Sequence, residues 1–381
     1  MINIVTIVGA RPQIIKAAAL SRAVNGPFRD RLREVIVHTG QHYDHNLSQV
    51  FFDELQIPQP DINLDTGSAS HGRQTARMIE GIEEILLDQR PRAVVLYGDT
   101  NSTLAGAVAA SKLQVPVVHI EAGLRSFNKA MPEEVNRILC DHVSTLLFTP
   151  TLAGLRNLQH EGFVTGIEGP WSADHPGVFH CGDVMYDNSL YFAGMATQQS
   201  KILDRFGLTP GGYLLATIHR DHNTDQPERL EAIFGAIQQL AAEQEVTVVL
   251  PLHPRTRKIM AGNLSKALFA AVTNNPRIIF SEPVSFLDMI NLEKHAAMIL
   301  TDSGGVQKEA YFFRKPVMVL RPQTEWVEIV EQGAGRICDA DPQKILEAYH
   351  YFRGQHGMDY PPVFGDGRAA EFIARKMVEA F

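Results

Sequence analysis

The stretch LTDSGGVQKEA, residues 300–310, decides how this chain folds. Apolar residues lead into a Ser-Gly-Gly turn, and the residues after the turn have the composition of a helix. Glycines let backbone N–H groups approach an anion closely, and a helix N-terminus carries a partial positive charge of roughly half a unit. A strand–turn–helix unit that binds phosphate at Ser303, Gly304 and Gly305 is therefore predicted, although a ligand-free Gly-rich turn fits the stretch taken alone. Glu309, about one turn into the helix, is placed to accept hydrogen bonds from a sugar hydroxyl.

The same alternation of short β-branched runs and amphipathic stretches extends in both directions from this unit. Expected strands lie at residues 2–8, 34–39, 93–97, 115–120, 146–149, 213–218, 246–250, 277–280, 298–300 and 316–320. A Gly- and Pro-rich loop is expected over 164–177 and a helix over 185–206. The pattern predicts an α/β chain with two Rossmann-like, doubly wound parallel-sheet domains, residues 1–185 and 186–367, and a cleft between them.

Composition limits the class of protein. The 381 residues suffice for two domains, and 45% hydrophobic with 20% charged residues is typical of a soluble globular protein. A net charge of −8 argues against a nucleic-acid partner. The three cysteines lack the spacing of a zinc site or a disulfide framework. No run approaches the ~20 apolar residues that span a membrane, and residues 1–8 do not resemble a signal peptide, so a cytoplasmic protein is expected.

The first expected strand ends at Gly9-Ala10-Arg11-Pro12-Gln13, with Lys16 one turn into the following helix. A turn after the first strand of a parallel sheet faces the ligand site, so Arg11 and Lys16 are candidates for an anionic ligand or leaving group. A solvated arginine and a surface lysine remain the alternative. A single glycine does not meet the dinucleotide fingerprint, which argues against NAD.

Carboxylates follow further strands of the first half. Asp99 and Glu121 come directly after two expected strands, and Glu133 opens a helix after residues 126–131. The carboxyl ends of parallel strands meet at one edge of a sheet, so Asp99 and Glu121 are expected to share the site and to transfer protons. Helix capping is the alternative for each acid, and it is strongest for Glu133.

In the second half, His219 and His253 each end an expected strand near the Ser303 turn. Two imidazoles beside a phosphate-binding turn suit a diphosphate clamp. The sequence His219-Arg220-Asp221 resembles a kinase catalytic loop, but the other kinase motifs are missing. The histidine pairs 42/45 and 219/222 lie at turns after strands rather than on helices, so no metal site is expected.

Seven short motifs, taken together, resemble the non-hydrolysing UDP-N-acetylglucosamine 2-epimerases, which are similar to glycosyltransferases of the two-Rossmann, glycosyltransferase-B-like type. The motifs are GARPQ (9–13) with Lys16, TGQH (39–42), YGDT (97–100), HIEAGLR (119–125), PEEVNR (132–137), TDSGG (301–305) with Gln307 and Glu309, and GDG (365–367). Their order along nearly the whole chain makes the set specific.

The resemblance implies an isomerase that inverts C2 of a UDP-sugar by elimination of UDP and re-addition, with neither metal nor redox cofactor. It implies Asp99, Glu121 and Glu133 as the acid/base set, and Lys16 and His219 as groups that support developing charge. UDP and substrate would bind at Arg11, Arg137, His253, Ser303, Gly304, Gly305 and Glu309. By analogy, residues 368–381 form a helix that returns to the first domain, the protein is a homodimer, and its product, UDP-ManNAc from UDP-GlcNAc, serves surface polysaccharide synthesis.

The opening GARPQ and the segment TEWVE, residues 324–328, resemble the branch that includes UDP-2,3-diacetamido-2,3-dideoxyglucuronate 2-epimerases. That substrate requires an additional cation near C6, for which Arg125, Lys129 and Arg220 are candidates. Three further functions compete with the epimerase reaction, namely a glycosyltransferase of the same fold, a hydrolysing epimerase and a non-catalytic nucleotide-sugar sensor.

Overall fold

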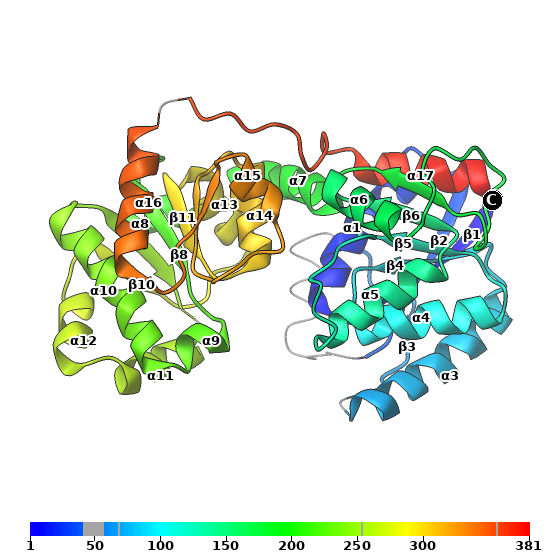
Figure 1. Cartoon of the computed structure of the whole chain (residues 1–381), viewed down its shortest axis with the longest axis horizontal. Coiled ribbons are helices and arrows are strands. Elements are labelled where there is room, and N and C mark those ends of the chain that lie inside the picture. The colour runs from blue at the N-terminus through cyan, green and yellow to red at the C-terminus, as the bar shows by residue number, and fades with distance from the viewer. Residues whose placement is uncertain (41–56, 68, 253, 356) are drawn as a thin grey trace. The chain divides into compact units, whose positions relative to one another are not determined.

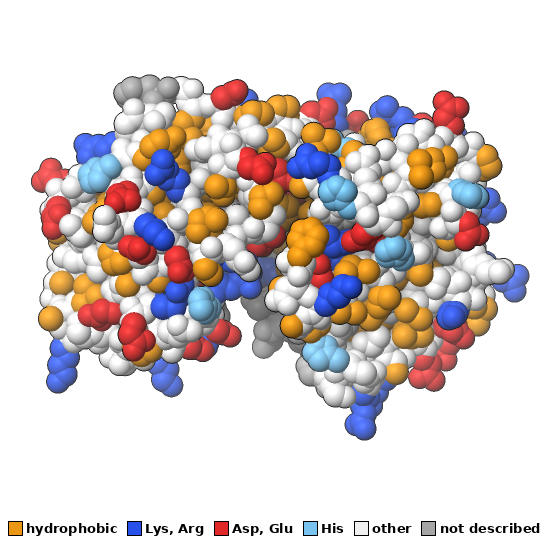
Figure 2. All heavy atoms as spheres, viewed as in Figure 1, with side chains coloured by type: hydrophobic (Ala, Val, Ile, Leu, Met, Phe, Trp, Pro, Cys, Tyr) orange, Lys and Arg blue, Asp and Glu red, His pale blue; other side chains and the backbone are white. Residues whose placement is uncertain are grey.

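The computed structural model describes residues 1–40, 57–67, 69–252, 254–355 and 357–381 (Figure 1). Its chain divides into two compact units. Unit 1 comprises Met1–Asn188 and Pro362–Phe381, and unit 2 comprises Ser189–Pro361. The boundaries predicted from the sequence, 185/186 and 367/368, remain a proposal for where independently folding domains would be separated. On the face drawn in Figure 2, acidic and basic side chains are interspersed over both units.

Unit 1 contains a parallel sheet in the order β3-β2-β1-β4-β5-β6-β7. Its strands are β1 Ile2–Val8, β2 Leu32–His38, β3 Ile62–Asn63, β4 Ala93–Tyr97, β5 Val117–Ile120, β6 Leu146–Thr149 and β7 Gly177–His180. The strand order reverses between β1 and β4, which is where ligands bind in open α/β sheets.

Helices cover both faces of this sheet because successive residues of a strand point to opposite faces. Ile4 and Val8 of β1 pack into one core, with α1 and α17, and Val5 and Ile7 pack into the other, with α3 and α4. The helices are α1 Arg11–Asn25, α3 His71–Gln89, α4 Asn101–Lys112, α5 Pro132–His142, α6 Leu152–His160 and α17 Ala369–Ala380. A sheet buried on both faces explains the continuous apolar runs in the sequence.

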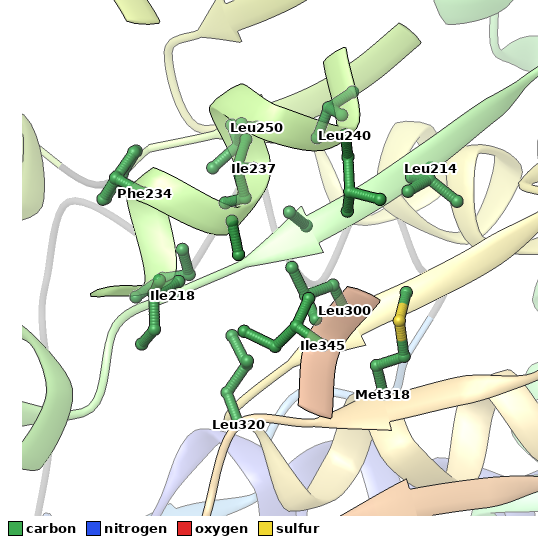
Figure 3. Packing of buried hydrophobic residues seen from close by; sticks show 14 of the residues in the cluster. Leu214, Ile218, Phe234, Ile237, Leu240, Leu250, Leu300, Met318, Leu320 and Ile345 are labelled. Atoms are coloured by element: carbon green, nitrogen blue, oxygen red, sulfur yellow. The ribbon is translucent and has the colours of Figure 1, made fainter. Parts of the chain in front are cut away.

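Unit 2 has a second parallel sheet, in the order β10-β9-β8-β11-β12-β13. Its strands are β8 Tyr213–Thr217, β9 Thr247–Pro251, β10 Ile278–Ser281, β11 Met298–Thr301, β12 Val317–Val319 and β13 Gly335–Ile337. In Figure 3, Leu214, Leu300 and Met318 of this sheet face Leu240 of α10 (Pro227–Glu243) and Ile345 of α16 (Pro342–Gly354). The prediction of two Rossmann-like parallel-sheet units is confirmed.

The helices of unit 2 follow the same alternation. They are α8 Ile202–Phe206, α9 Asp221–Thr224, α10 Pro227–Glu243, α11 Pro254–Asn263, α12 Lys266–Thr273, α13 Phe286–His295, α14 Gly304–Phe312, α15 Val327–Glu331 and α16 Pro342–Gly354, and α7 Val184–Gln199 leads into them from unit 1. Among the described residues, no helix has the length and apolar character needed to span a membrane.

One helix boundary in the prediction is wrong. The expected helix over 185–206 ends at Gln199, and α8 starts at Ile202. The hydroxyl of Ser200 accepts a hydrogen bond from the Ile202 N–H, 3.3 Å, and donates one to Asp288, 2.6 Å. A serine that bonds its neighbouring backbone competes with the helix ladder, so the helix breaks at this residue.

The chain re-enters unit 1 through a close contact between two glycines. A Cβ on Gly182 would lie 2.8 Å from the carbonyl oxygen of Phe364, and a Cβ on Gly365 would lie 2.8 Å from the Cα of Gly182. Both glycines have φ of +87°. The carboxylate of Asp187 then accepts the backbone N–H groups of Ala369, 3.1 Å, and Ala370, 2.8 Å, at the start of α17. This contact gives a structural reason for the GDG motif.

Candidate active site

The end of β1 is connected to the end of β4 by the side chain of Gln13. Its carbonyl oxygen accepts the N–H of Gly9, 2.9 Å, and its amide donates to the Tyr97 carbonyl, 2.8 Å, and to Thr103, 3.0 Å. A Cβ on Gly9 would lie 1.9 Å from the hydroxyl oxygen of Ser102, so only glycine fits there. The GARPQ motif therefore fixes the two central strand ends against each other.

Lys16 and Glu121 form an ion pair beside these strand ends. The Lys16 Nζ lies 2.6 Å from Glu121 Oε2, and both side chains are mostly buried. A Cβ built on Gly98 would lie 3.5 Å from that Nζ and 3.7 Å from Glu121 Oε1, so the Gly98-Asp99 turn lies against the pair. Glu121 itself has φ of +73°, a left-handed conformation that is uncommon for a residue with a side chain.

Asp99 has a separate cation. Its carboxylate pairs with the guanidinium of Arg137, which also contacts Glu134 Oε2 at 3.2 Å. The amide of Asn136 donates to the Asp99 carbonyl, 2.9 Å. Asp99 and Glu121, at the ends of the paired strands β4 and β5, are thus held near each other, each by its own basic residue. Sequence reasoning selected Asp99, Glu121, Lys16 and Arg137, and the structure groups them in unit 1.

The two glutamates at the start of α5 differ in environment. Glu133 is exposed, whereas Glu134 is buried and accepts the N–H groups of Ser126, 2.8 Å, and Phe127, 2.9 Å. Glu134 therefore holds the loop before α5, and the exposed carboxylate of Glu133 is the one open to solvent. The periodicity of α5 alone, which separates adjacent residues by about 100°, would indicate that they cannot both face inward.

A buried network behind the site was not anticipated. His119 lies 2.6 Å from Asp141 Oδ1 through its Nδ1 and 2.8 Å from the Gly98 carbonyl through its Nε2. Burial alone would lower the pKa of His119, but the neighbouring Cys140 and Asp141 raise it well above the usual range. A protonated imidazole donates from both nitrogens, so His119 fixes the Gly98 turn. The position of His119 inside the apolar run VVHI, residues 117–120, is the sequence signal that could have indicated a buried hydrogen-bonding partner for this histidine.

Arg125 completes this network, and its burial argues against it among the three candidates for a cation near C6. Its guanidinium is fully buried, 2.7 Å from Asp141 Oδ2 and 2.7 Å from Glu161 Oε2. Burial opposes ionisation of Asp141, but His119 and Arg125 lower the pKa of its carboxyl below the usual range. Lys129 and Arg220, the other two candidates for the C6 cation, are exposed.

In unit 2, the Ser303 turn opens a nine-residue helix, as predicted. The hydroxyl of Ser303 caps α14 by accepting the Val306 N–H, 3.5 Å. A Cβ on Gly304 would lie 2.3 Å from Glu325 Oε1, so the end of the Glu325 side chain lies against this glycine. Lys308 is buried with its Nζ 4.2 Å from the centre of the Trp326 ring. Gly305 is exposed, and the backbone at the start of α14 is the feature that suits a phosphate.

Asp302 connects this turn to the end of β8. Its carboxylate accepts the N–H groups of His219, 3.1 Å, and Arg220, 3.0 Å, and the amide of Asn223, 3.1 Å. The Nδ1 of His219 lies 3.1 Å from the same carboxylate, and half of the imidazole remains exposed. Burial opposes ionisation, but His219 and these N–H donors lower the pKa of Asp302 below its usual range. His219 is thereby held beside the Ser303 turn.

The remaining predicted residues differ in their exposure to solvent. Arg11 is exposed at the start of α1, and Glu309 is partly buried on α14. His253 lies outside the described residues. Across the ranges that the structure describes, no group of three or more His, Cys, Asp or Glu side chains has the arrangement of a metal site.

The model of one protein family, described as UDP-N-acetylglucosamine 2-epimerase, matches residues 28–378. The chain belongs to this family. A UDP-N-acetylglucosamine 2-epimerase homolog of Methanococcus maripaludis is 46% identical over 369 residues, which is 97% of either chain. The UDP-2,3-diacetamido-2,3-dideoxy-D-glucuronate 2-epimerase of Pseudomonas aeruginosa is 45% identical over 377 residues, which is 99% of either chain.

A solved UDP-GlcNAc 2-epimerase of Methanocaldococcus jannaschii, in complex with UDP-GlcNAc and UDP, is 38% identical and has a TM-score of 0.81. The match covers 99% of this chain and all of that one. The predicted epimerase family, the isomerase class and the glycosyltransferase-B-like pattern of two Rossmann units are confirmed. The protein is a UDP-sugar epimerase of this family.

Proposed function

We propose that this epimerase inverts C2 of a UDP-linked 2-acetamido sugar and converts UDP-GlcNAc into UDP-ManNAc. The proposal rests on one observation, the Lys16–Glu121 ion pair of 2.6 Å against the turn that carries Asp99. Asp99 has its own cation in Arg137. Two carboxylates with separate cations suit a reaction that removes a proton from one face of a sugar ring and returns one to the other face.

The reaction needs no external oxidant or reductant. A base takes the C2 proton, the C2–H electron pair forms a C1–C2 double bond, and the anomeric C–O bond breaks so that UDP leaves with its electron pair. The bound intermediates are 2-acetamidoglucal and UDP. UDP then adds back to C1 while a proton is delivered to the opposite face of C2. We assign the acid/base steps to Asp99, Glu121 and Glu133, without dividing the two transfers among them.

Negative charge develops on the departing diphosphate, so cations near it lower the barrier. Lys16 and His219 are proposed to stabilise this charge. Arg11, Arg137 and His253 are proposed to bind the substrate together with the Ser303-Gly304-Gly305 turn. Glu309 is proposed to accept hydrogen bonds from the ribose. The complex of the Methanocaldococcus jannaschii relative with UDP-GlcNAc and UDP supports a UDP-sugar as the substrate.

The second candidate substrate is UDP-2,3-diacetamido-2,3-dideoxyglucuronate. The name of the Pseudomonas aeruginosa relative, 45% identical over 99% of either chain, favours it. Since Arg125 is enclosed by Asp141 and Glu161, the exposed Lys129 and Arg220 are the remaining candidates to meet the C6 carboxylate. The C2 chemistry is the same for both substrates.

We further propose that the product serves surface polysaccharide synthesis, that the protein acts in the cytoplasm, and that it is a homodimer. These three statements rest on the family resemblance. Sedimentation equilibrium of the purified chain tests the last one, and a monomer at micromolar concentration would contradict it.

The test of the function is proton NMR of the purified protein with UDP-GlcNAc in D2O, without added metal or NAD. We expect UDP-ManNAc and deuterium at C2 of the sugar nucleotides. Free sugar with UDP would indicate a hydrolysing enzyme instead. If C2 keeps its proton, the same measurement with the diacetamido uronic acid nucleotide decides for the second substrate, and failure of both contradicts the epimerase mechanism.

A further inference from the structure

Glu293 is a glutamate in the interior of unit 2. It lies near the end of α13, where its side chain is 1% exposed. Helix α13 packs against α14, the helix that begins at the Ser303 turn. The carboxyl group of Glu293 contacts that of Glu309, which the proposed function assigns to the ribose. A buried acid therefore contacts Glu309, the residue that is proposed to bind the ribose.

Two carboxylates cannot both be ionised in contact with each other in the protein interior, so the pair must hold a proton. Among the described residues, no N–H or O–H group donates to either oxygen of Glu293. Its hydrogen-bonding neighbour is itself a carboxyl group, so one of the two must carry the hydrogen. Burial, and then the charge of Glu309, raise the pKa of Glu293 well above its usual range. Glu293 is also the more deeply buried of the two, since Glu309 is only partly buried, so Glu293 is the member of the pair that holds the proton.

We propose that Glu293 is a positioning residue. Its protonated carboxyl group donates a hydrogen bond to Glu309 and so orients the Glu309 carboxylate toward the ribose hydroxyls of a uridine nucleotide. The inference rests on the proposed function through the role of Glu309. A hydrogen bond from a carboxylic acid to a carboxylate is short and strong, and it fixes the plane of the acceptor. One oxygen of Glu309 is then engaged by Glu293, and the other is directed to the ligand.

The orientation matters because glutamate has three rotatable side-chain bonds. A free carboxylate loses rotamer entropy when it binds a hydroxyl, whereas one held by Glu293 has already lost it. Glu293 therefore increases the discrimination between a ribose and a sugar without hydroxyls. A nucleotide that lacks the 2′ and 3′ hydroxyls gains nothing from this arrangement.

The first measurement is infrared difference spectroscopy of the full chain at neutral pH. We expect a protonated-carboxyl C=O band in the wild type that is lost in Glu293→Gln. The difference spectrum is required because burial also raises the pKa of Glu34. If no such band separates the two proteins, the proton on Glu293 is excluded and the proposal is overturned, whatever the protein binds.

The second measurement is calorimetric binding of UDP and of 2′,3′-dideoxy-UDP. The wild type is expected to prefer UDP by about 10- to 100-fold, as hydrogen bonds to a charged group imply. Glu293→Leu, which keeps the volume but removes the donor, should reduce this preference at least about fivefold while affinity for the dideoxy analogue changes little. Glu293→Gln keeps an N–H donor and should retain the preference.

Ile290→Val, a buried change one turn earlier in α13, is the matched control and should leave both affinities unaltered. An unchanged preference in Glu293→Leu overturns the positioning role. Equal loss of both affinities also overturns it, since that result reports only a damaged fold. If the wild type binds no UDP, the proposed function is contradicted. The role of Glu293 in ribose binding is then contradicted as well, even if the infrared band is present.

Discussion

Each unit holds its site with a buried aspartate, but the partners of the two aspartates differ. Asp141 in unit 1 is contacted by two cations, His119 at 2.6 Å and Arg125 at 2.7 Å, and by one backbone N–H, that of Gly123 at 3.1 Å. Asp302 in unit 2 is held mainly by the backbone N–H groups of His219 and Arg220. His119 and Arg125, the two cations at Asp141, are fully buried, whereas the His219 side chain is 49% exposed.

The difference separates two ways to fix a turn. In unit 1, loss of one partner leaves a charge without compensation in the interior, so the fold itself depends on the complete network. In unit 2, backbone donors remain whatever side chain occupies position 219 or 220, so the turn survives while its imidazole can act on a ligand. We therefore expect changes at Asp141 to affect mainly the stability of unit 1, and changes at Asp302 to affect mainly ligand binding.

The largest expected effect concerns chemistry. Glu121→Gln should lower kcat about 10²- to 10⁴-fold, because an amide cannot take or return the C2 proton. Affinity for UDP, which we assign mainly to unit 2, should stay within a few-fold in calorimetry. A loss of UDP affinity as large as the loss in kcat would contradict the assignment of chemistry to unit 1 and of nucleotide binding to unit 2.

The next effect concerns stability. Asp141→Asn should reduce the free energy of unfolding of unit 1 by about 3–5 kcal/mol, because His119 loses its buried counter-charge and Arg125 retains only Glu161. Asp302→Asn should cost unit 2 only about 1–3 kcal/mol, since it disturbs hydrogen bonds but leaves no buried cation. Urea unfolding followed by fluorescence measures both, because the two tryptophans, Trp171 and Trp326, lie in different units. Similar losses in both units would refute the contrast.

A smaller effect is expected in ligand binding. Asp302→Asn should weaken UDP binding about tenfold, because His219 loses the carboxylate that orients its ring beside the Ser303 turn. Asp141→Asn, assayed at a temperature where unit 1 remains folded, should change UDP affinity less. Calorimetric titration with UDP compares the two, and the reverse order would assign nucleotide orientation to unit 1.

The pH dependence of unit 1 is expected to be smaller still. The folded-state pKa of His119 is raised, so its contribution to stability is complete below its ordinary value of 6.5 and is lost as the pH rises through the folded value. The pKa of Asp141 is lowered, so its contribution is present above 3.8 and is lost on acidification. Between pH 7 and 10, the urea midpoint reported by Trp171 should fall, and His119→Gln should flatten that slope. An identical slope in the variant would contradict the charged state of His119.

The smallest effect is expected at the surface of unit 2. Asp221→Asn removes an exposed ion pair with Arg255, which still contacts Asp225. The urea midpoint reported by Trp326 should not shift measurably, since exposed pairs are screened by water and salt. A clear shift would indicate that charge at this surface contributes to the Asp302 turn.

The sequence by itself determined the two series of strands and helices, the Ser303 turn, the strand ends that precede Asp99 and Glu121, and the place of Lys16 in the first helix. Asp99 and Glu121 follow strands, whereas Lys16 lies in the helix after β1. All of these features are local, because strand alternation, glycine and the start of a helix depend on residues that are near in the chain. The motif set also identified the family.

Only the tertiary structure decided which charges are buried together. It paired His119 with Asp141, enclosed Arg125, and distinguished Glu134 from Glu133. It also brought Glu293 of α13 to Glu309 of α14. The state of a charged side chain depends on the partners that packing supplies from distant segments, and the cost of burying it unpaired is what selects those partners.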